Sequence, residues 1–339
     1  MAVYRVTPAG AGDTDGSSWA NAMGEAEFEV SIEGGGSQAI AAGDIYYVQA
    51  GTYTLDSSYD SSATNGTGIL PISIIGVKAA TVNETPTYTD WPTVGSEDRP
   101  TFVCGAYLIT VGTYNKIFNC MFTGATSQFV ITGTYTKVYN CKFYSTHDGS
   151  TGYCLSTGNS SDIMCCEFTG DANAYDHVYG YYNGAYCRVI YCYFHDINGG
   201  FIGNSGCSIL FCVFDNLKAS GIYNGTRPGT FAANNTFYNC LIAVNCSTGH
   251  GCWINNIVDS CTNGFKWTTQ EDASFYLNNH GDDVRNTTMW TLVATTMPHM
   301  DPEVTSGDPQ FSVPGSDFSL GPSSPCVATG MQIELAVGD

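Results

Sequence analysis

A short pattern recurs seven times between residues 118 and 258 of this 339-residue chain. Each copy has an apolar residue, any residue, Cys or Asn, any residue, and Phe or Val, as in FNCMF at residues 118–122. Counted between central residues, successive copies lie 21, 25, 26, 20, 23 and 21 residues apart. A period in the twenties indicates a solenoid, because one unit cannot bury its apolar face alone and must stack on its neighbours. Apolar residues alternate within each copy, as in a strand, so the solenoid is predicted to be a β-helix.

The pattern favours a parallel β-helix over a leucine-rich repeat. No copy contains helical spacing of apolar residues, and Leu is scarce where a leucine-rich repeat requires it. Stacked coils lie about 4.8 Å apart, so side chains at equivalent positions form ladders along the helix. One inward ladder is predicted to contain Cys120, Cys141, Cys166, Cys192, Cys212, Asn235 and Asn256. A second inward ladder is predicted to contain Phe122, Phe143, Phe168, Phe194, Phe214, Phe237 and Val258.

The chain is strongly acidic, with a formal net charge of −20 from 31 acidic and 11 basic residues. This charge argues against nucleic acid and against an anionic membrane as partners, and it repels polyanionic substrates unless metal ions intervene. The first residues contain no basic region followed by an apolar one, so no signal peptide is predicted. The longest apolar run, residues 69–77, is interrupted by Pro71 and is too short to span a bilayer.

Fifteen cysteines raise the question of a disulfide scaffold. At least five of them belong to the predicted inward ladder, where a thiol acts as a small apolar filler. An odd total also leaves one cysteine without a partner within the chain, and disulfides are rare in reducing compartments. Buried, reduced thiols are therefore expected rather than a disulfide framework.

Both ends of the chain carry segments that occur together in a known group of proteins. The segments are GDTDGSSWANA at residues 12–22, AGDIYYVQAGTY at 42–53, DPQF at 308–311, DFSL at 317–320 and SPCVATG at 324–330. They resemble the N-terminal cap, first coil and closing segment of right-handed parallel β-helix repeat proteins, the pectate-lyase-like proteins of bacteria and phages. That family commonly ends S-P-A-I-D-A-G, and this chain has Ala328 where the Asp would fall. The resemblance implies an all-β, right-handed parallel β-helix; the fold hosts lyases, hydrolases, adhesins and virion spikes.

The chain is predicted to form one elongated unit with a cap at each end. Residues 1–41 form the N-terminal cap, with a short helix around residues 19–26. Residues 42–279 form the parallel β-helix, and residues 280–339 form the C-terminal closing segment. Residues 79–100, rich in Thr, Pro and Glu, are predicted to be a loop that interrupts the coils. Caps are expected because an open end of a β-helix exposes unpaired strand edges.

Carboxylates follow the ladder Phe on several coils, at Asp171, Asp196 and Asp215. Enzymes of the resembling fold place acids on neighbouring coils, and a glycosidase needs two carboxyls, one as acid and one as base or nucleophile. These three residues are therefore the candidate catalytic groups. The same spacing also suits turns, because Asp tolerates turn geometry and bonds its own backbone, and Asn239 and Asp259 occur at similar offsets. Both interpretations stay open at this point.

Charged residues also share one repeat position, four residues before the central Cys. They are Lys116, Lys137, Asp162 and Arg188. One acid among three bases does not make a calcium site, so an outward ladder of paired charges is predicted. The chain contains no Walker loop, no zinc-ligand spacing and no Gly-x-Ser-x-Gly motif, so neither a metal nor a cofactor is predicted.

Four largely apolar residues on two adjacent coils lie outside the ladders. If the ladder cysteines point inward, the outward groups are Tyr191, Tyr193, Phe211 and Val213. An exposed apolar patch on a soluble protein marks a partner surface, so these four are predicted to form the interface of a homo-oligomer. Phage β-helix spikes, which the chain resembles, are often trimers, so a trimer is favoured. The alternative is that residues 280–310 or a long loop cover the patch.

Two hypotheses about function follow. The preferred one is a structural or adhesive surface protein, a phage virion component such as a head decoration protein, fibre or tailspike. It rests on a rigid acidic β-helix without an export signal and without a decisive site. Such a protein is made in the cytoplasm without a signal peptide and ends on the surface of a virion or extracellular particle. The competing hypothesis is a polysaccharide hydrolase or lyase, a depolymerase that acts in a groove of the β-helix.

Overall fold

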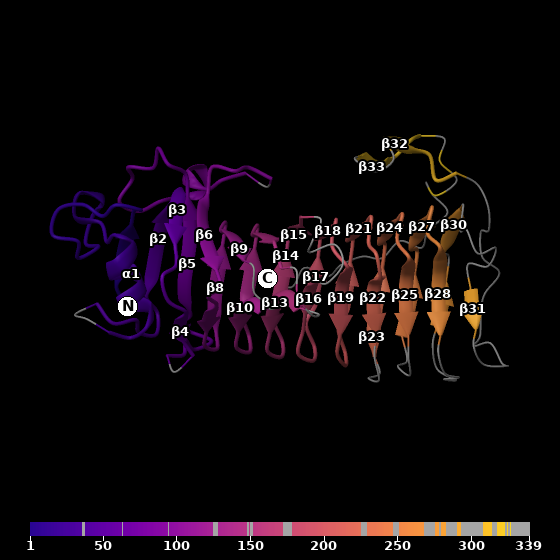
Figure 1. The fold of residues 1–339 in the computed structure, drawn as a ribbon, viewed down its shortest axis with the longest axis horizontal. Helices are drawn as coiled ribbons and strands as arrows, with labels where there is room; N and C mark the ends of the chain where they lie inside the picture. Colours follow the sequence, from indigo (N-terminus) through magenta and orange to yellow (C-terminus); the bar gives the residue numbers. More distant parts are fainter. Residues whose placement is uncertain are drawn as a thin grey trace.

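The computed structural model describes residues 1–35, 38–62, 64–93, 95–124, 128–147, 149, 152–171, 178–224, 229–246, 251–267, 275–277, 279–282, 290–292, 308–313, 317–322, 324 and 326. In this part of the chain, each coil adds one strand to each of three parallel sheets (Figure 1). Nearly all regular structure is strand, so the predicted all-β, parallel β-helix is confirmed. None of the helices described is long and apolar enough to cross a membrane.

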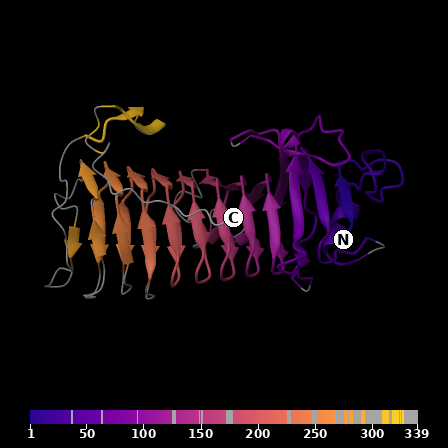
Figure 2. The ribbon, with the colours of Figure 1, turned by 180° about the vertical axis from the view of Figure 1, so that it is seen from behind.

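The first sheet contains β1 (Val3–Val6), β2 (Ile45–Gln49), β5 (Ile72–Val77), β8 (Asn115–Phe118), β11 (Lys137–Tyr139), β14 (Asp162–Met164), β17 (Arg188–Ile190), β20 (Ser208–Leu210), β23 (Thr230–Ala233), β26 (Gly251–Ile254) and β29 (Phe275–Leu277). The second contains β3 (Gly51–Thr54), β6 (Pro100–Gly105), β9 (Met121–Gly124), β12 (Lys142–Ser145), β15 (Glu167–Gly170), β18 (Tyr193–His195), β21 (Val213–Asp215), β24 (Thr236–Tyr238), β27 (Ile257–Asp259) and β30 (His280–Asp282). The third contains β4 (Tyr59–Ser61), β7 (Ile109–Val111), β10 (Gln128–Thr132), β13 (Gly152–Thr157), β16 (Val178–Tyr182), β19 (Gly199–Gly203), β22 (Ser220–Asn224), β25 (Ile242–Cys246), β28 (Asn263–Trp267) and β31 (Trp290–Leu292). Figure 2 shows strands of successive coils side by side along the helix.

The predicted phenylalanine ladder is confirmed and lies on the inner face of the second sheet. Its seven members, from Phe122 to Val258, are register partners from coil to coil and are buried. Neighbouring rings from Phe122 to Phe237 stack with centroids 4.6–5.4 Å apart. Tyr53 and Phe102 extend the stack toward the N-terminus. The spacing of about 4.8 Å between paired strands sets this distance, so parallel pairing alone brings each ring onto the previous one.

The predicted Cys/Asn ladder is also confirmed, and its two residue types make the same hydrogen bond. The Cys141 thiol donates to the Ile117 carbonyl of the preceding coil at 3.4 Å. The Asn235 amide donates to the equivalent carbonyl, that of Ile209, at 3.0 Å. Asn279 continues the ladder beyond the predicted members. A buried polar group needs a partner, and this position provides one carbonyl that accepts from either a thiol or an amide.

Thiol titration of the denatured, unreduced protein is expected to detect most of the fifteen cysteines. Twelve of them are buried, and the ladder thiols donate to backbone carbonyls, as Cys120 does to Phe118 and Cys212 does to Val189. Parallel pairing already fixes the spacing of adjacent coils, so a disulfide there is not needed to hold them. A titration that finds one thiol or none would contradict this expectation.

From β8 to β27, each coil turns from the first sheet to the second through a residue with a left-handed backbone. This residue directly precedes the ladder position, and its φ is 51–60° at Asn119, Asn140, Cys165, Tyr191, Phe211, Asn234 and Asn255. Asn adopts this conformation readily, whereas an aromatic residue rarely does. Tyr191 and Phe211 were predicted to point outward from a straight strand, but the chain bends at both of them. Tyr191 projects from its bend with 55% of its surface exposed.

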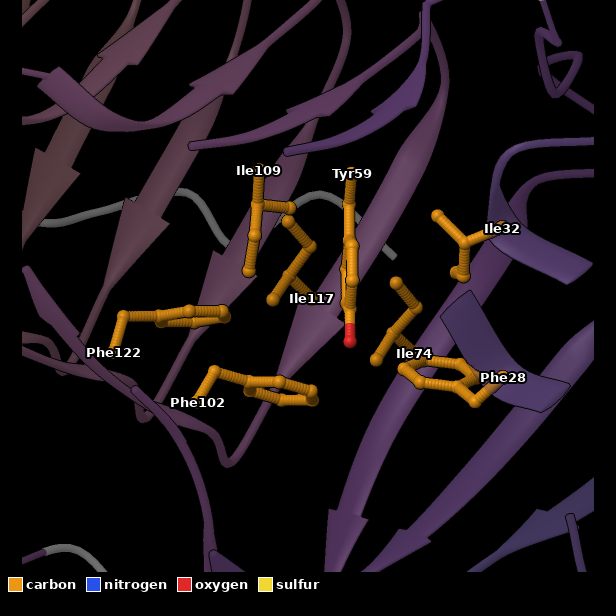
Figure 3. Close-up of a pocket in the computed structure, with 8 residues that line it drawn as sticks. All are labelled: Phe28, Ile32, Tyr59, Ile74, Phe102, Ile109, Ile117 and Phe122. Atoms are coloured by element: carbon orange, nitrogen blue, oxygen red, sulfur yellow. The ribbon is translucent and has the colours of Figure 1, made fainter. Parts of the chain in front are cut away.

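The N-terminal end of the helix is closed by α1 (Glu25–Ile32). The helix predicted around residues 19–26 is a 3₁₀ turn, η1 (Trp19–Asn21), followed by α1. Phe28 of α1 lies against Tyr59 and Phe102 of the first coils, as Figure 3 shows. The space between these side chains amounts to about 10 Å³ and is lined by apolar groups, which is too little for a water molecule. This hollow is therefore packed core.

Strands continue at both ends of the range predicted for the β-helix. At the N-terminal end, β1 lies inside the predicted cap and already pairs with β2 of the β-helix. At the other end, β30 and β31 extend the second and third sheets past residue 279. The antiparallel hairpin of β32 (Phe311–Val313) and β33 (Asp317–Leu320) packs on Tyr238 of β24. Residues 280–310, the alternative cover for the apolar patch, lie largely outside the described residues. The domain boundaries themselves stay predictions.

Candidate functional site

The outer face of the second sheet carries two columns of side chains that alternate with the buried ladder. One column directly follows the ladder Cys and contains Met121, Lys142, Glu167, Tyr193 and Val213. The other lies two residues further on and contains Thr123, Tyr144, Thr169, His195, Asp215 and Tyr238. Because the strands are parallel and in register, each coil places its side chains about 4.8 Å from those of the next. Ionisable groups distant in the sequence therefore meet on this face.

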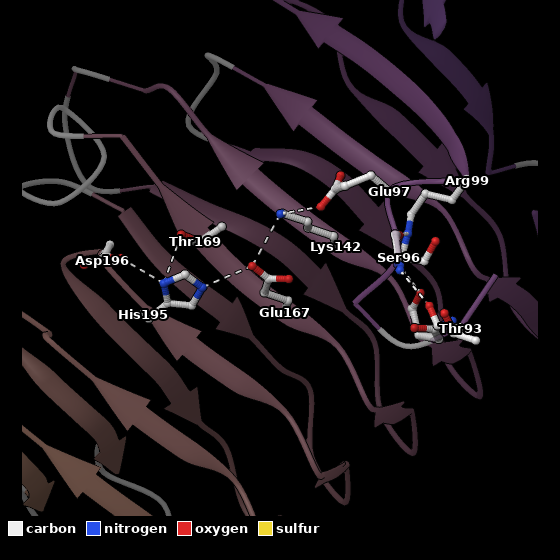
Figure 4. A network of polar contacts seen from close by, with 10 residues as sticks. Thr93, Ser96, Glu97, Arg99, Lys142, Glu167, Thr169, His195 and Asp196 are labelled. Atoms are coloured by element: carbon white, nitrogen blue, oxygen red, sulfur yellow. Dashed lines mark hydrogen bonds and ion pairs between the residues drawn. The ribbon is translucent and has the colours of Figure 1, made fainter. Parts of the chain in front are cut away.

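A continuous chain of ionisable groups crosses this face (Figure 4). Lys142 Nζ lies 3.0 Å from Glu97 Oε1 and 3.5 Å from Glu167 Oε1. The same oxygen of Glu167 accepts a hydrogen bond from His195 Nε2 at 3.1 Å. His195 Nδ1 donates to Asp196 Oδ2 at 2.9 Å. The chain thus alternates carboxylates with two nitrogen bases, so each basic group is held between two acids.

The two carboxylate contacts of His195 favour the protonated form of its imidazole. Burial by itself lowers the pKa of His195, but the hydrogen bonds to Glu167 and Asp196 outweigh burial and raise the pKa above the ordinary value of 6.5. Burial raises the pKa of Glu167, but His195 and Lys142 outweigh it, so this pKa falls below 4.5. Both ring nitrogens face carboxylates, and only an imidazolium carries the two N–H donors that this arrangement uses.

Replacing His195 by Gln is expected to cost the most stability at mildly acidic pH. A histidine whose folded pKa is raised stabilises the fold fully below its unfolded pKa and loses that contribution as pH rises through the folded pKa. The difference in free energy of unfolding between wild type and His195→Gln should therefore shrink as the pH rises above the ordinary histidine pKa of about 6.5 and through the raised pKa of the folded state. At the acidic side, the contribution of Glu167 is lost as pH falls through its lowered pKa. Urea unfolding at a series of pH values measures this, and a difference that grows with pH would contradict it.

Tyr193 and Asp215 form a second pair beside this chain. The Tyr193 hydroxyl donates to Asp215 Oδ2 at 3.1 Å, and the Tyr193 ring stacks on His195 with centroids 4.2 Å apart. Burial raises the pKa of Asp215, and the charge of Asp196 adds to this, which together outweigh the hydrogen bond from Tyr193. Burial also raises the pKa of Tyr193, so the phenol keeps its proton at neutral pH. The site thus contains one carboxyl with a raised pKa, Asp215, on the same outer face as one with a lowered pKa, Glu167, two coils away.

One wall of the site is the segment that leaves the coils between β5 and β6, at residues 78–99. The segment includes the short η2 (Tyr88–Asp90) and brings Glu97 to Lys142. Arg99 anchors it, because the buried guanidinium donates to the Asn140 carbonyl at 2.8 Å. A hollow of about 190 Å³ opens at this wall, lined among others by Gly95, Arg99, Lys142, Glu167, Tyr191 and Tyr193.

The other wall is the β32–β33 hairpin, whose Phe311 and Phe318 pack on Tyr238. Figure 1 shows this hairpin on the same side of the helix as residues 78–99. Between Lys142 and Tyr238 the outer face extends over four ladder steps, about 19 Å at the usual strand spacing. The polar chain and the Tyr193–Asp215 pair lie in this interval.

Comparison with solved structures supports the fold assignment. Neither a protein-family model nor a curated protein matches the sequence. Among solved structures, the chain is similar to pectate lyase Pel9A, with a TM-score of 0.64 and 14% identity over 98% of this chain and 92% of the lyase. It is also similar to an alginate lyase from Paenibacillus sp. str. FPU-7, with a TM-score of 0.54 and 11% identity over 89% of this chain and 98% of that one. The chain is a right-handed parallel β-helix of the pectate-lyase-like fold. The resemblance carried by its terminal segments is therefore confirmed.

Two of the three predicted catalytic acids come together in this β-helix. Asp196 and Asp215 lie on neighbouring coils beside His195, and the charge of one raises the pKa of the other. Asp171 follows β15 on the preceding coil, where its backbone N–H donates to the Ser145 carbonyl at 3.1 Å. On that coil, Glu167 is the acid that contacts His195 and Lys142.

Asp196 also has the turn role that was the alternative to catalysis for these acids. Asp196 has a left-handed backbone with φ 53°, and its Oδ1 accepts a hydrogen bond from the Asn216 amide at 2.7 Å. Asn239 donates to Asn216 in the same way one coil further on. Asp196 is therefore the first member of a turn ladder and a partner of His195 at the same time.

Three residues of the site escaped the sequence analysis, namely Lys142, Glu167 and Glu97. The first two share the repeat position of Tyr193, directly after the ladder Cys. The sequence does carry a signal for Lys142 and Glu167: their repeat position is charged on these two successive coils and uncharged on the following ones. Tyr193 was predicted to be an interface residue, but its hydroxyl donates a hydrogen bond to Asp215 and its ring stacks on that of His195.

A lyase of this fold is expected to use a Ca²⁺ site of clustered acids. In the described part of this β-helix, no group of three or more His, Cys, Asp or Glu side chains is arranged to hold a metal ion. The carboxylates nearest to such an arrangement are already engaged, Glu167 by His195 and Asp215 by Tyr193. The residues present do not fit a Ca²⁺ centre, so no chemical step is assigned to a metal.

Proposed function

We propose that this β-helix cleaves a polysaccharide on the outer face of its second sheet by acid–base catalysis. The observation that carries the proposal is a pair of carboxyls whose pKa values are displaced in opposite directions, raised for Asp215 and lowered for Glu167. Cleavage of a glycosidic bond by hydrolysis needs one protonated carboxyl as general acid and one ionised carboxyl as base or nucleophile. Asp215 takes the first role and Glu167 the second.

The neighbouring groups support these two roles. Asp215 gives its proton to the oxygen of the leaving sugar, while Glu167 either accepts a proton from the attacking water or attacks the sugar itself. Lys142 and His195 keep Glu167 ionised. Tyr193 holds Asp215 in position through its hydroxyl.

The substrate class is supported by the walls and by the similar proteins. A saccharide chain lying along the helix fits between residues 78–99 and the β32–β33 hairpin. The two similar solved structures are named as a pectate lyase and an alginate lyase, which supports a polysaccharide as substrate. Among the groups named above, four carboxyls face two bases, so the site carries more negative than positive charge. This balance favours hydrolysis at a neutral sugar over β-elimination, which requires neutralisation of a uronate carboxylate.

The proposal is tested by incubating the purified protein with a panel of neutral and acidic polysaccharides. Hydrolysis creates reducing ends without a new carbon–carbon double bond, whereas β-elimination creates both, and the double bond absorbs in the ultraviolet. New reducing ends without this absorbance are expected. Folded protein that releases no reducing ends from any member of the panel would contradict the proposal.

The structural or adhesive hypothesis, a component of a phage virion or another extracellular particle, stays a prediction. One observation favours a surface contact of the predicted kind. Tyr191 is more than half exposed and stacks on Phe211 with centroids 5.2 Å apart. An aromatic pair with one exposed and one partly buried ring, on an otherwise acidic surface, suits a protein partner. Enzymatic cleavage and attachment to a particle are compatible, since a depolymerase can act from a particle surface.

Sedimentation of the Tyr191→Asp, Phe211→Asp double variant is expected to show a smaller species than wild type, for which a trimer is favoured. Asp tolerates the left-handed backbone of both positions, so the fold should be retained while the aromatic pair is lost. A Lys218→Gln variant serves as an exposed control. A wild type that is monomeric at high concentration, or an unchanged oligomer in the double variant, would contradict the interface.

A further inference from the structure

Two lysines lie side by side on the outer face of the first sheet, which the candidate site does not use. Lys116 of β8 and Lys137 of β11 are register partners, and Asp162 of β14 and Arg188 of β17 continue the column. Arg188 binds both oxygens of Asp162, at 2.7 and 2.8 Å. The predicted ladder of paired charges is confirmed for these two residues, but it is wrong for the lysines, which face each other.

Neither ammonium group has an acidic partner among the residues that the structure describes. With Asp162 occupied by Arg188, no carboxylate in the described part of the chain lies within ion-pair distance of Lys116 or Lys137. Like charges directly opposite each other in a sheet destabilise the pair. In a chain with 31 acidic residues, a neighbouring acid would relieve this repulsion easily. The arrangement is therefore suited to an anion supplied from outside.

Both lysines open into a hollow of about 220 Å³. Its opposite wall is the loop that includes Gly68, Ile69 and Pro71. This loop is fixed by hydrogen bonds from Gly66 N to the Thr113 carbonyl and from Leu70 N to Thr67 Oγ1, both at 2.9 Å. The hollow is large enough for one sugar ring rather than for a long polymer segment.

An aromatic surface lies beside the lysines. Tyr114 and Tyr135 line the same hollow and stack with centroids 4.6 Å apart and planes 12° from parallel. Both residues have a left-handed backbone, with φ 53° and 57°, at the bend that leads into the first sheet. Half of the Tyr135 surface is exposed, so one face of the stack remains open to a ligand. A flat apolar face next to two cations is a combination that a carboxylated sugar matches on both counts.

We infer that the hollow formed by Lys116, Lys137, Tyr114 and Tyr135 binds a carboxylate-bearing sugar residue. The carboxylate bridges the two ammonium groups, and the apolar face of the pyranose ring stacks on Tyr135. The site lies on the first sheet and holds a saccharide without cleaving it, so the inference does not depend on the activity proposed for the second sheet. It also keeps an acidic sugar away from the carboxyl-rich cleavage face.

The inference can be tested one lysine at a time by nuclear magnetic resonance. The chain has six lysines, and reductive ¹³C-methylation labels each of them while keeping its charge. The probe is a galacturonate trimer, and a glucose trimer is the neutral control. Single Lys→Gln variants assign the signals. Lys142 reports on the second sheet in the same spectra, and Lys78 and Lys218 report on the remaining surface.

The acidic trimer is expected to shift the Lys116 and Lys137 signals and to leave those of Lys78 and Lys218 in place, while the neutral trimer shifts none of them. In calorimetric titration, Lys116→Gln, Lys137→Gln should weaken the binding at least tenfold. Tyr135→Asn, which suits the left-handed backbone, should weaken it to a smaller degree. Lys218→Gln should bind like wild type.

Four results would overturn the inference. The first is an acidic trimer that leaves both lysine signals unmoved. The second is an acidic trimer bound by the double variant as tightly as by wild type. The third is equal binding of adenosine monophosphate and the acidic trimer, which would make the hollow a general anion site and not a sugar site. A shift of Lys142 alone would place acidic sugars on the second sheet and would also contradict it.

Discussion

Asp215→Asn should reduce kcat for polysaccharide cleavage by about 10²–10⁴-fold, the usual contribution of a general acid. Asn retains the shape of the side chain and still accepts the hydrogen bond from the Tyr193 hydroxyl, but it has no proton to give to the leaving oxygen. Glu167→Gln should cause a loss of the same order, because the amide is neither a base nor a nucleophile. Initial rates of reducing-end formation at saturating substrate measure both effects.

The chain provides a closely matched control for Asp215. Asp259 stands in the same column of the second sheet two coils further on, and it is 8% exposed against 7% for Asp215. Asp259→Asn therefore makes the same chemical change at the same kind of position outside the site. It should leave kcat unchanged. If Asp215→Asn retains full activity, or if both variants lose it equally, the acid–base assignment is wrong.

Phe194→Ala should lower the free energy of unfolding by about 3–5 kcal/mol, the usual cost of truncating a buried aromatic residue. The ring is fully buried and is stacked on both sides, with centroids 4.6 Å from Phe168 and 4.9 Å from Phe214. It also covers Gly180, where any larger side chain would collide with it. A cavity left here cannot close, because the coil spacing is fixed by hydrogen bonds on both sides.

Urea unfolding followed by circular dichroism measures this loss. Tyr186→Asn is the control, since Tyr186 is mostly exposed and Asn suits its left-handed backbone. The control should change stability by less than about 0.5 kcal/mol, as expected for a surface substitution. A cost below about 1 kcal/mol for Phe194→Ala would mean that the ladder is not a continuous core.

The ladders could be predicted because a solenoid converts sequence period into spatial neighbourhood. Once Cys141 and Cys166 occupy the same position in successive repeats, parallel pairing makes them neighbours, and the same holds for Phe143 and Phe168. The bends were harder to predict. Alternation was counted through Tyr191 as if the strand were straight, although Asn at the equivalent positions of other repeats indicated a left-handed residue.

The candidate site was only partly predictable, for two physical reasons. Asp215 was found because acids after the ladder Phe were the pattern sought. Glu167 was missed because it lies on the strand, where outward residues are usually inert. Glu97 could not be found from the period at all, because it belongs to an excursion that follows no repeat and meets Lys142 across 45 residues.

The buried ladder changes from thiols to amides along the β-helix. The hydrogen bonds that tie one coil to the next therefore differ in strength between the two halves. Each amide ties its coil to the preceding one twice: Asn256 donates to the Ala232 carbonyl at 3.1 Å and accepts from Asn235 N at 3.1 Å. A thiol is a weak donor, as in the 3.8 Å contact from Cys166 to the Val138 carbonyl.

The coils that carry the proposed cleavage face, from Lys142 to Asp215, all lie in the half whose ladder consists of thiols. The backbone amide protons of the ladder cysteines in these coils should exchange with solvent faster than the backbone amide protons of Asn235 and Asn256. The face proposed to bind a saccharide thus rests on coils tied by the weaker thiol hydrogen bonds, and the hairpin at one end of this face packs on a coil tied by the amide ladder.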